Sequence, residues 1–164
     1  MKIAVYPGTF DPVTYGHLDV IKRGSSLFEH LIVSVGHNPL KKSLFSVQER
    51  MDMISGHIKE LHNVEVDSFG GMLVDYLKKK DTNVILRGIR TVSDFENEFQ
   101  RALTNRVLRK DVETVFVMTS QQYSFLNSSL IKEAVYLGGN VKEFVPQDIE
   151  EQLKCKLKSG YNGC

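Results

Sequence analysis

The sequence has few of the features that would place a protein in a membrane, in an oxidising compartment or on a nucleic acid. Its 164 residues include only two cysteines, Cys155 and Cys164. Their spacing fits no metal site, and we expect incidental thiols in a reducing cytoplasm. No apolar run approaches the ~20 residues of a membrane-spanning helix, and we expect no secretory leader. The formal net charge of +1 creates no field that would attract nucleic acid or an anionic membrane, so we expect neither as a partner.

Motifs of several well-known catalytic mechanisms are also absent from the sequence. It has no GxxxxGK[ST] phosphate loop and no GxSxG nucleophile elbow. No spacing of cysteines and histidines indicates a zinc site. Apart from His17, we interpret the histidines as structural or solvent-facing: His30, His37, His57 and His62. With no nucleophile beside a base, a covalent intermediate is not expected. Phosphoryl transfer is compatible with this composition, because it needs positioning and charge stabilisation more than covalent help.

Short apolar segments alternate along the chain with segments of helical periodicity. A length of 164 residues with 41% hydrophobic and 25% charged residues fits a single globular domain with its own core. The strand candidates are apolar on both faces, as buried parallel strands are: Lys2–Tyr6, Leu31–Gly36, Val64–Ser68, Val84–Arg87 and Thr114–Met118. We therefore predict one α/β domain over residues 1–164, with a Rossmann-like, doubly wound sheet of five parallel strands and helices on both faces.

Helical patterns fill the intervals between these strands. Two of them start at capping boxes, Ser46-x-x-Glu49 and Ser93-x-x-Glu96, and one stops at Gly138-Gly139, a favourable helix end. The predicted helices are Gly16–His30, Ser46–Leu61, Met72–Lys80, Ser93–Val107, Ser128–Leu137 and a C-terminal helix at about Gln147–Lys158. In such folds ligands bind beyond the carboxyl ends of the strands. Polar residues that suit phosphate chemistry follow several of the predicted strands.

The loop after the first strand, GTFDPVTYGH, is the strongest candidate for a functional site. Its glycines and the helix start aim backbone N–H groups and the positive helix end at one point, where an anion binds well. Thr9, Thr14 and His17 converge on that helix end, and the imidazole adds a hydrogen-bond donor for charge stabilisation. The alternative is a tight turn whose glycines only permit positive φ and whose His17 lies on the surface. The convergence of the three side chains favours a phosphate site.

Two further loops carry groups that bind phosphate. Lys41 and Lys42 follow the second strand. An ammonium group there is a compact charge suited to a phosphate, although paired lysines in loops are commonly just solvated. After the fifth strand, Ser120–Ser129 is rich in hydroxyl and amide side chains. These side chains either cap the next helix or surround a phosphate tail with hydroxyl and N–H groups.

Two arginines follow the fourth strand. Arg87 lies directly at the strand end and Arg90 comes after a glycine, which suggests two guanidinium forks facing phosphate oxygens. The alternative is that they form ion pairs with nearby acidic residues, Asp94, Glu96 or Glu98. We favour the phosphate interpretation.

With these residues assembled, the sequence resembles the bacterial phosphopantetheine adenylyltransferases, a family of the nucleotidyltransferase superfamily marked by an (H/T)xGH motif. The resemblance covers nearly the whole chain and rests on segments in the family's order and spacing: YPGTFDPVTYGH, NPLKK, FSVQER, Arg87–Glu98 and YSFLNSSLIKE. It implies transfer of AMP from ATP to 4′-phosphopantetheine, which yields dephospho-CoA and pyrophosphate in the penultimate step of coenzyme A biosynthesis. It also implies a homohexamer, and Mg²⁺ that enters with ATP and is held by phosphate oxygens and water rather than by protein side chains.

The resemblance also implies roles for individual residues. His17 is expected to stabilise the transition state at the α-phosphate, with Lys41 and Arg90 as the other catalytic groups. The ATP-binding residues that it implies are Thr9, Phe10, His17, Gly88, Ile89, Arg90, Glu98, Tyr123, Ser124, Phe125, Leu126, Asn127, Ser128 and Ser129. The residues implied to bind 4′-phosphopantetheine are Thr9, Lys41, Leu73 and Arg87.

Three positions depart from the family's pattern. Tyr123 stands where Trp is usual, Leu126-Asn127-Ser128 where Ile-Ser-Ser is usual, and Gly71 where Asp is common. Two alternative functions stay open. One is another adenylyl- or cytidylyltransferase of the superfamily, acting on nicotinate mononucleotide or glycerol 3-phosphate; the other is a non-catalytic nucleotide-binding module. The run Arg87–Glu98 argues against the first alternative. The presence of His17 together with the candidate lysines and arginines argues against the second.

Overall fold

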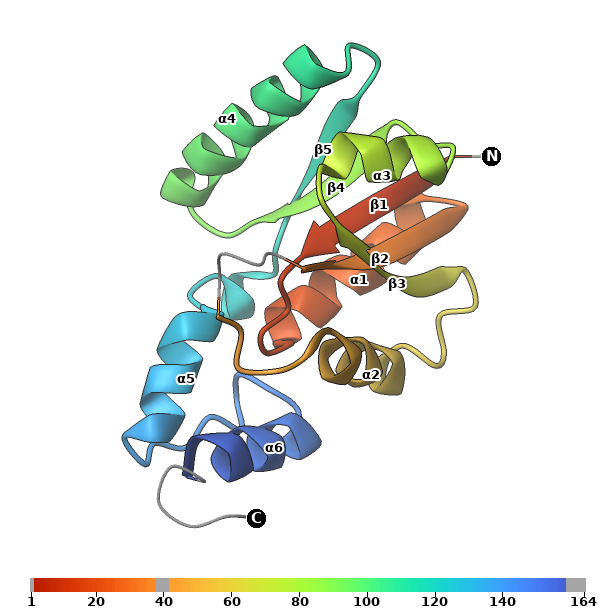
Figure 1. Ribbon diagram of the computed structural model, residues 1–164. Helices are drawn as coiled ribbons and strands as arrows, with labels where there is room; N and C mark the ends of the chain where they lie inside the picture. The colour runs from red at the N-terminus through yellow and green to blue at the C-terminus, as the bar shows by residue number, and fades with distance from the viewer. Residues whose placement is uncertain (1, 38–41, 159–164) are drawn as a thin grey trace.

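The computed structural model describes residues 2–37 and 42–158, which form a parallel sheet with helices on both faces (Figure 1). The strands are β1 (Ile3–Gly8), β2 (His30–His37), β3 (Val64–Gly70), β4 (Val84–Ile89) and β5 (Glu113–Met118). The helices are α1 (Tyr15–Leu27), α2 (Val47–His57), α3 (Leu73–Lys79), α4 (Val92–Leu108), the short 3₁₀ helix η1 (Gln121–Tyr123), α5 (Ser128–Tyr136) and α6 (Gln147–Lys158). The predicted alternation and fold class are confirmed; η1 was not predicted.

The order of the strands places an opening beside β1. The sheet runs β3-β2-β1-β4-β5, so the chain builds outward from β1 and then crosses back to add β4 on the other side. β1 pairs with β2 along its whole length, from Ile3 with His30 to Gly8 with Val35. Its register with β4 consists only of Val5 with Ile85. The two strands therefore separate toward their carboxyl ends, at the switch in strand order where ligands of such sheets bind.

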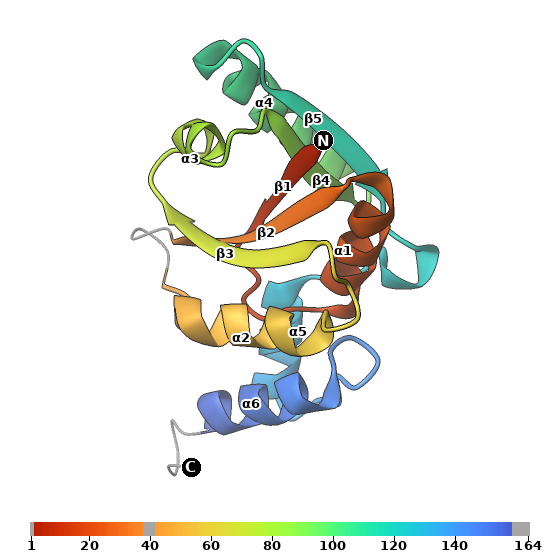
Figure 2. The ribbon, with the colours of Figure 1, turned by 90° about the vertical axis from the view of Figure 1, so that its right-hand side faces the viewer.

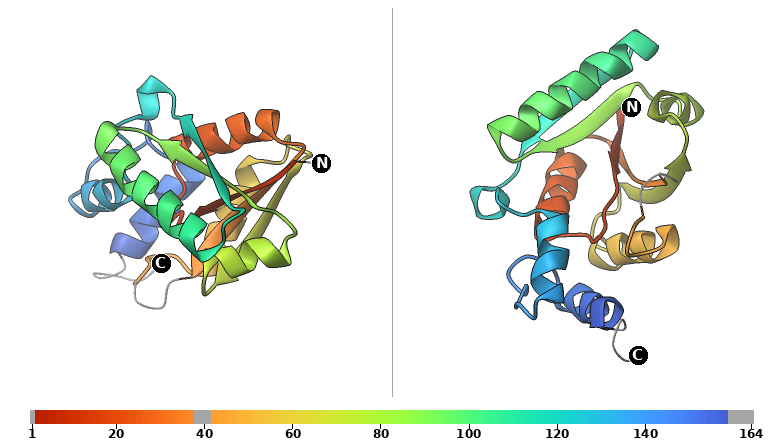
Figure 3. Two further views of the ribbon diagram at one scale, coloured as in Figure 1. Left: turned by 90° about the horizontal axis from the view of Figure 1, so that it is seen from above. Right: turned by 60° about the vertical axis from the view of Figure 1, so that its left-hand side comes forward.

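Each face of the sheet has its own core. Ala4 and Tyr6 of β1 pack on the side that α1, α2, α5 and α6 cover, while Val5 between them packs on the other side. α3 contributes Leu77 to this second core, and α4 lies over β4 and β5 (Figure 3). α6 packs on α5 at the bottom of the molecule, far from α4 at its top (Figure 2).

Close packing of α1 on the sheet depends on two glycines. A Cβ atom on Gly24 would lie 2.5 Å from a methyl carbon of Leu86, and one on Gly88 would lie 2.7 Å from a methyl carbon of Val20. Both distances are far shorter than a carbon–carbon contact. Without these glycines α1 would move outward, and its N-terminus would shift away from the carboxyl end of β4.

We expect Gly88→Ala to lower the free energy of unfolding by about 1–3 kcal/mol, because the added methyl group overpacks the contact between α1 and β4. Denaturant titration measures the change. Gly56→Ala is the matched control: it lies in the last turns of α2 and has no atom within 4 Å of the added Cβ, so helix propensity alone should make it neutral or stabilising. Equal stability of the two variants would show that the close approach of α1 is not required.

Local capping explains most helix boundaries. The predicted capping box at Ser46 is confirmed: its hydroxyl accepts from the Glu49 N–H and its own N–H donates to the Glu49 carboxylate at 2.7 Å. Gly138 follows α5 with φ of +86°, as expected for a glycine at a helix end. Helix α1 ends at Leu27 rather than at the predicted His30, because Phe28 adopts an extended conformation while its N–H closes on the Gly24 carbonyl.

The predicted capping box at Ser93 is wrong. Helix α4 already starts at Val92, and Thr91 caps it by accepting from the Asp94 N–H at 3.2 Å. The Ser93 hydroxyl lies in the first turn and bonds to the Thr91 hydroxyl at 2.9 Å instead of accepting from Glu96. Thr91 and Ser93 both have a suitable hydroxyl, and the sequence pattern alone did not decide between two starts that differ by two residues.

The expectation that Cys155 is an incidental thiol is also wrong, because Cys155 in α6 is disulfide-bonded in the structure. Cys164 lies outside the described residues. Cys155 lines neither of the two cavities described below.

Candidate active site

Two adjoining cavities lie at the carboxyl ends of the strands. The first, of about 530 Å³, lies between the loop after β1, the start of α1, the end of β4 and the start of α5. The second, of about 490 Å³, lies between β1, the end of β2, the start of α3 and one side of α4. The residues that line both are Pro7, Gly8, Thr9, Arg87 and Glu98. The border between the two cavities therefore lies where β1 and β4 separate.

The loop after β1 takes its shape from Phe10. Its backbone has φ of +51°, a left-handed conformation that a bulky residue rarely adopts. The buried ring packs edge-on against Tyr6, with centroids 5.3 Å apart, and against His17 at 5.1 Å. A Cβ atom on Gly8 would lie 2.7 Å from this ring, so glycine is needed there. The result is that Thr9 faces both cavities.

Asp11 connects three segments of the chain at the wall of the first cavity. Its carboxylate is only 5% exposed and accepts the N–H groups of Leu44 at 3.0 Å and Phe45 at 2.9 Å, and the Lys132 ammonium at 2.7 Å. Burial raises the pKa of this carboxyl, but the hydrogen bonds and the charge of Lys132 outweigh burial, and the net pKa lies below its usual value. Asp11 is therefore ionised at neutral pH and holds the loop after β1, the segment before α2 and helix α5 together.

The Asp11–Lys132 pair was not predicted from the sequence. Both residues line the first cavity, although they are 121 positions apart. A signal for Lys132 exists: it lies four residues after Ser128, on the same face of α5. For Asp11 the sequence offers only its place inside the GTFDP segment.

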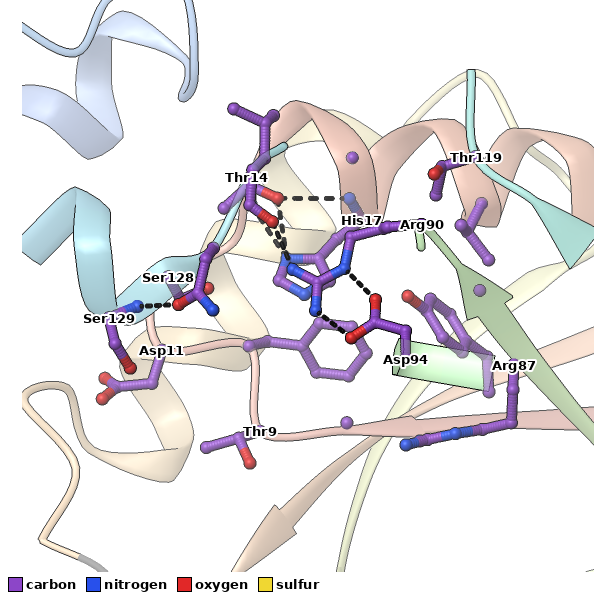
Figure 4. A pocket seen from close by; sticks show the side chains of 18 of the residues that line it. Thr9, Asp11, Thr14, His17, Arg87, Arg90, Asp94, Thr119, Ser128 and Ser129 are labelled. Carbon is purple, nitrogen blue, oxygen red and sulfur yellow. Dashed lines mark hydrogen bonds and ion pairs between the residues drawn. The ribbon is translucent and has the colours of Figure 1, made fainter. Parts of the chain in front are cut away.

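His17 is oriented by the residue that caps α1. The Thr14 hydroxyl accepts from the His17 N–H at 3.3 Å, and the Thr14 backbone N–H donates to the His17 imidazole at Nδ1, 3.1 Å away. Because Nδ1 accepts this hydrogen bond, the neutral ring carries its proton on Nε2. Burial, with the nearby positive charges of Arg90 and Arg87, lowers the pKa of His17 to about 4. At neutral pH the imidazole is therefore uncharged and offers an N–H donor. The ring lines the first cavity and lies beside Thr14 and Arg90 in Figure 4.

The lowered pKa of His17 predicts a pH dependence of stability. In the unfolded chain this imidazole gains a proton below its ordinary pKa of about 6.5, whereas in the folded protein it stays neutral until about pH 4. The unfolded state thus binds more protons in that window, and the free energy of unfolding falls as the pH falls through it.

We expect the wild type to lose about 1 kcal/mol more than His17→Gln between pH 7 and pH 5.5, as measured by denaturant titration at both pH values. The glutamine variant serves as the control because every other titrating group is shared. If the two proteins lose the same stability, the imidazole is not buried in its neutral form.

Both predicted arginines are ion-paired in the structure. Arg87 donates to Glu98 through Nε at 2.5 Å and Nη2 at 2.6 Å, and its Nη1 donates to the Pro7 carbonyl at 2.5 Å. Arg90 donates to Asp94 through Nε at 2.6 Å and Nη2 at 3.0 Å, and also to the Leu126 carbonyl. The ion-pair alternative therefore describes these side chains. They still line the first cavity, and the Asp94 pair lies beside His17 in Figure 4.

The start of α5 forms another wall of the first cavity. The Asn127 side chain caps this helix by accepting from the Ser129 N–H at 2.8 Å. The Ser128 hydroxyl donates to the Pro12 carbonyl at 3.0 Å, which fixes α5 to the loop after β1. Leu126, Asn127, Ser128 and Ser129 all line the cavity. Asn127 thus caps the helix, as one of the two interpretations of this segment predicted. The same turn places hydroxyl groups at the wall of the cavity.

Several residues proposed to bind ATP lie outside the two cavity walls. Tyr123 of η1 stacks on Tyr15 with centroids 6.0 Å apart, and Phe125 packs edge-on against Phe144 at 5.6 Å. Ser124 donates its hydroxyl to the Gln121 carbonyl, and Ile89 is buried in the core. On the acceptor side, Leu73 and Gly71 line the second cavity, and Gly71 has φ of +79°. Lys41 lies outside the described residues; its neighbour Lys42 lines the first cavity.

No group of three metal-binding side chains is found among residues 2–37 and 42–158. In the same part of the chain, no helix has the length and the apolar character needed to cross a membrane.

Residues 5–134 match the cytidylyltransferase-like family, so fold, site and family together define a nucleotidyltransferase. The chain is 54% identical over 158 residues to the phosphopantetheine adenylyltransferase of Caldanaerobacter subterraneus subsp. tengcongensis, covering 96% of this chain and 99% of the relative. It is 51% identical to that of Carboxydothermus hydrogenoformans over 164 residues, 100% of both chains. The chain belongs to the phosphopantetheine adenylyltransferases, and the resemblance noted from the sequence is confirmed.

Solved structures share the fold at much lower identity. A putative nicotinate-nucleotide adenylyltransferase from Vibrio parahaemolyticus superposes with a TM-score of 0.67 at 16% identity, covering 93% of this chain and 99% of that one. A bifunctional NMN adenylyltransferase/ADP ribose pyrophosphatase from Francisella tularensis gives 0.72 at 18% identity, covering 96% of this chain and 50% of that one. At these identities the likeness concerns the fold, and the Rossmann-like architecture is confirmed.

Proposed function

We propose that this chain transfers the adenylyl group of ATP to 4′-phosphopantetheine, forming dephospho-CoA and pyrophosphate, the penultimate step of coenzyme A biosynthesis. The observation that carries the proposal is the pair of adjoining cavities with Thr9 and Arg87 on their border. A transfer reaction needs two substrates whose reacting atoms meet, and two cavities with a common wall provide that arrangement. The family of the chain supports the same activity.

The residues that line each cavity suit one of the two substrates. The first cavity combines His17, two arginines and the start of α5, groups that bind and stabilise phosphates, and we assign it to ATP. The second has apolar walls such as Phe69, Leu73 and Ile85, which suit an extended, partly apolar chain, and we assign it to the pantetheine arm. The border between them then holds the acceptor phosphate next to the α-phosphate of ATP.

The chemistry follows as one in-line displacement. An oxygen of the acceptor phosphate attacks the α-phosphorus, the bond to the β-phosphate breaks, and pyrophosphate leaves with the bonding electrons. The attacking phosphate is already anionic, so no general base is needed. The neutral His17 ring donates its Nε2–H to the α-phosphate oxygens as charge develops there. Arg90 and Lys41 add positive charge in this proposal.

The ion pairs of the two arginines are compatible with phosphate binding. A guanidinium group has about five N–H donors, and the pairing described above occupies Nε, Nη2 and one N–H of Nη1 in each case. The remaining N–H groups stay available, and the carboxylates fix the direction in which they point. In this role Glu98 orients Arg87 from the border of both cavities. Gly88 and residues 126–129 line the first cavity and complete the proposed nucleotide site, with Ser128 and Ser129 nearest the phosphates. Ile89 and residues 123–125 belong to this proposed site only as the family resemblance implies.

Mg²⁺ enters this proposal as part of the nucleotide substrate. It prefers phosphate oxygens and water to a cage of protein ligands, so it neutralises charge on ATP without a dedicated site. The cytoplasm, where ATP is supplied, is the proposed location.

We also propose that the protein is a homo-oligomer, and a hexamer as the family resemblance implies. Helix α4 has no buried residue, yet it carries an exposed apolar stripe of Phe95, Phe99, Leu103 and Val107, each at least 43% exposed. Such a stripe at helical spacing favours burial against another copy of the chain. α4 also contributes Arg101 and Ala102 to the second cavity, so assembly over this helix would support the acceptor site.

We expect Phe99→Glu to reduce the particle mass measured by light scattering after size exclusion, because a charge in the stripe opposes its burial. The control is Gln100→Glu, which adds the same charge at an exposed position of α4 outside the stripe. An unchanged mass for Phe99→Glu would argue against assembly through this face.

The direct test of the activity is incubation with ATP, Mg²⁺ and 4′-phosphopantetheine, followed by mass detection of dephospho-CoA. Nicotinate mononucleotide and glycerol 3-phosphate, each with ATP and with CTP, serve as competing acceptors in a pyrophosphate-release assay. Preference for either would favour another member of the superfamily. ATP binding by calorimetry without any acceptor-dependent pyrophosphate release would favour a non-catalytic nucleotide-binding module.

A further inference from the structure

A buried arginine, Arg50, lies next to the two cavities and contacts neither proposed substrate in the transfer proposed above. Arg50 lies in the first turns of α2 and is only 2% exposed. Its hydrogen-bond partners are backbone carbonyls: those of Thr9 at 2.5 Å, Gly36 at 3.3 Å and Ser46 at 3.2 Å. Burying a guanidinium group is unfavourable unless its donors are satisfied. The three carbonyls accept from Nε and Nη1 of Arg50, and they belong to three different segments.

Two of these segments form walls of the cavities. Thr9 lies on the border of both, and Gly36, at the end of β2, lines the second cavity. Ser46 caps α2, the helix that carries Arg50 itself. The guanidinium therefore fixes the distance between the loop after β1 and the end of β2.

The contact with Thr9 bears on the conformation of the next residue. The Thr9 carbonyl belongs to the peptide bond that precedes Phe10, whose φ is +51°. This left-handed conformation is unfavourable for phenylalanine, and surrounding contacts must hold it. A hydrogen bond to that carbonyl fixes the orientation of the peptide unit. The Phe10 ring, in turn, packs against the His17 imidazole at 5.1 Å.

We propose that Arg50 is a positioning residue for adenylyl transfer: through the Thr9 carbonyl and the Phe10 ring, it holds the His17 imidazole in its reactive position. The inference rests on the proposed function, since it assigns Arg50 to the same reaction. It predicts that loss of Arg50 lowers turnover more than it weakens substrate binding.

The test compares Arg50→Lys and Arg50→Met with Arg109→Met. Arg109 is a matched control because it also donates to a backbone carbonyl, that of Thr82 at 3.0 Å, but at the opposite edge of the sheet. Steady-state rates are measured well below each variant's unfolding midpoint, with dephospho-CoA as the product. Because a misplacement of about 1 Å can reduce the rate by about 100-fold, we expect kcat of both Arg50 variants to fall by about 10- to 100-fold. The KM for ATP should change by less than about threefold, and Arg109→Met should match the wild type.

A double-mutant cycle separates positioning from a merely structural role. If Arg50 acts through His17, then Arg50→Lys in a His17→Ala background should lower kcat by less than about threefold, because the group it positions is gone. A full, multiplicative effect in that background would overturn the proposal. So would folded Arg50 variants that keep kcat within about threefold of the wild type. If Arg50→Met does not fold, the lysine variant, which keeps the charge, decides. Failure of the unmodified protein to make dephospho-CoA would instead refute the proposed function.

Discussion

His17→Ala should lower kcat for dephospho-CoA formation by about 10²- to 10³-fold, while the affinity for ATP changes much less. Removal of one preorganised donor to a developing negative charge has an effect of this size. Thr14 holds Nδ1 of the ring, and Nε2–H is left for the transition state. The donor interaction is strongest when charge has accumulated on the α-phosphate, so its loss affects turnover more than binding. Pyrophosphate release gives kcat, and calorimetry with ATP gives the affinity.

A matched control for this variant is His30→Ala. His30 begins β2 at the opposite edge of the sheet and contacts Glu65, so its removal should leave kcat unchanged. The pH dependence adds a second check. Because the pKa of His17 is about 4, the neutral donor persists across the neutral range, and kcat should show no fall between pH 6 and pH 8 from this group. Wild-type turnover in His17→Ala would remove the imidazole from the mechanism.

Asp11→Ala should lower the free energy of unfolding by about 3 kcal/mol or more. The substitution leaves the Lys132 ammonium without its partner and the N–H groups of Leu44 and Phe45 without an acceptor. Asp11 is buried but Lys132 is 25% exposed, so the lost ion pair costs less than the ~3–5 kcal/mol of a fully buried pair. Each N–H group left without an acceptor adds about 1–3 kcal/mol. Because Asp11 joins the loop after β1 to α5, the variant should also lose most of its kcat. Denaturant titration measures the stability.

The control is Asp111→Ala, which also removes a carboxylate that pairs with a cation. Asp111 bonds to Arg109 on the surface, where water and salt replace the lost partner. Its unfolding midpoint should match the wild type. If Asp11→Ala proves as stable as Asp111→Ala, the connection through Asp11 contributes little to the fold.

The fold was predictable because its signals are local. Apolar runs and capping residues depend on neighbours within a few positions, and the strands, the sheet class and the cap at Ser46 are as the sequence indicates. The start of α4 was mispredicted for the same reason: Thr91 and Ser93 both offer a hydroxyl to the helix. Local patterns left that choice open.

The site was predictable only in part, because its assembly depends on distant contacts. The sequence indicates that Arg87 and Arg90 lie at the end of a strand. It does not indicate that their guanidinium groups pair with Glu98 and Asp94. The Asp11–Lys132 pair joins residues 121 positions apart. Local sequence patterns carry no information about contacts between residues so far apart. Residues that pack beside the site, such as Tyr123 on Tyr15, look the same in sequence as residues that line it.

Direct adenylyl transfer between the two cavities can be tested with ATP made chiral at the α-phosphorus. The protein is incubated with this ATP, Mg²⁺ and 4′-phosphopantetheine, and the configuration of phosphorus in dephospho-CoA is determined. A single in-line displacement predicts dephospho-CoA with inverted configuration. Retained configuration would require two displacements and a covalent intermediate, which is incompatible with direct transfer; the absence of dephospho-CoA would also rule direct transfer out.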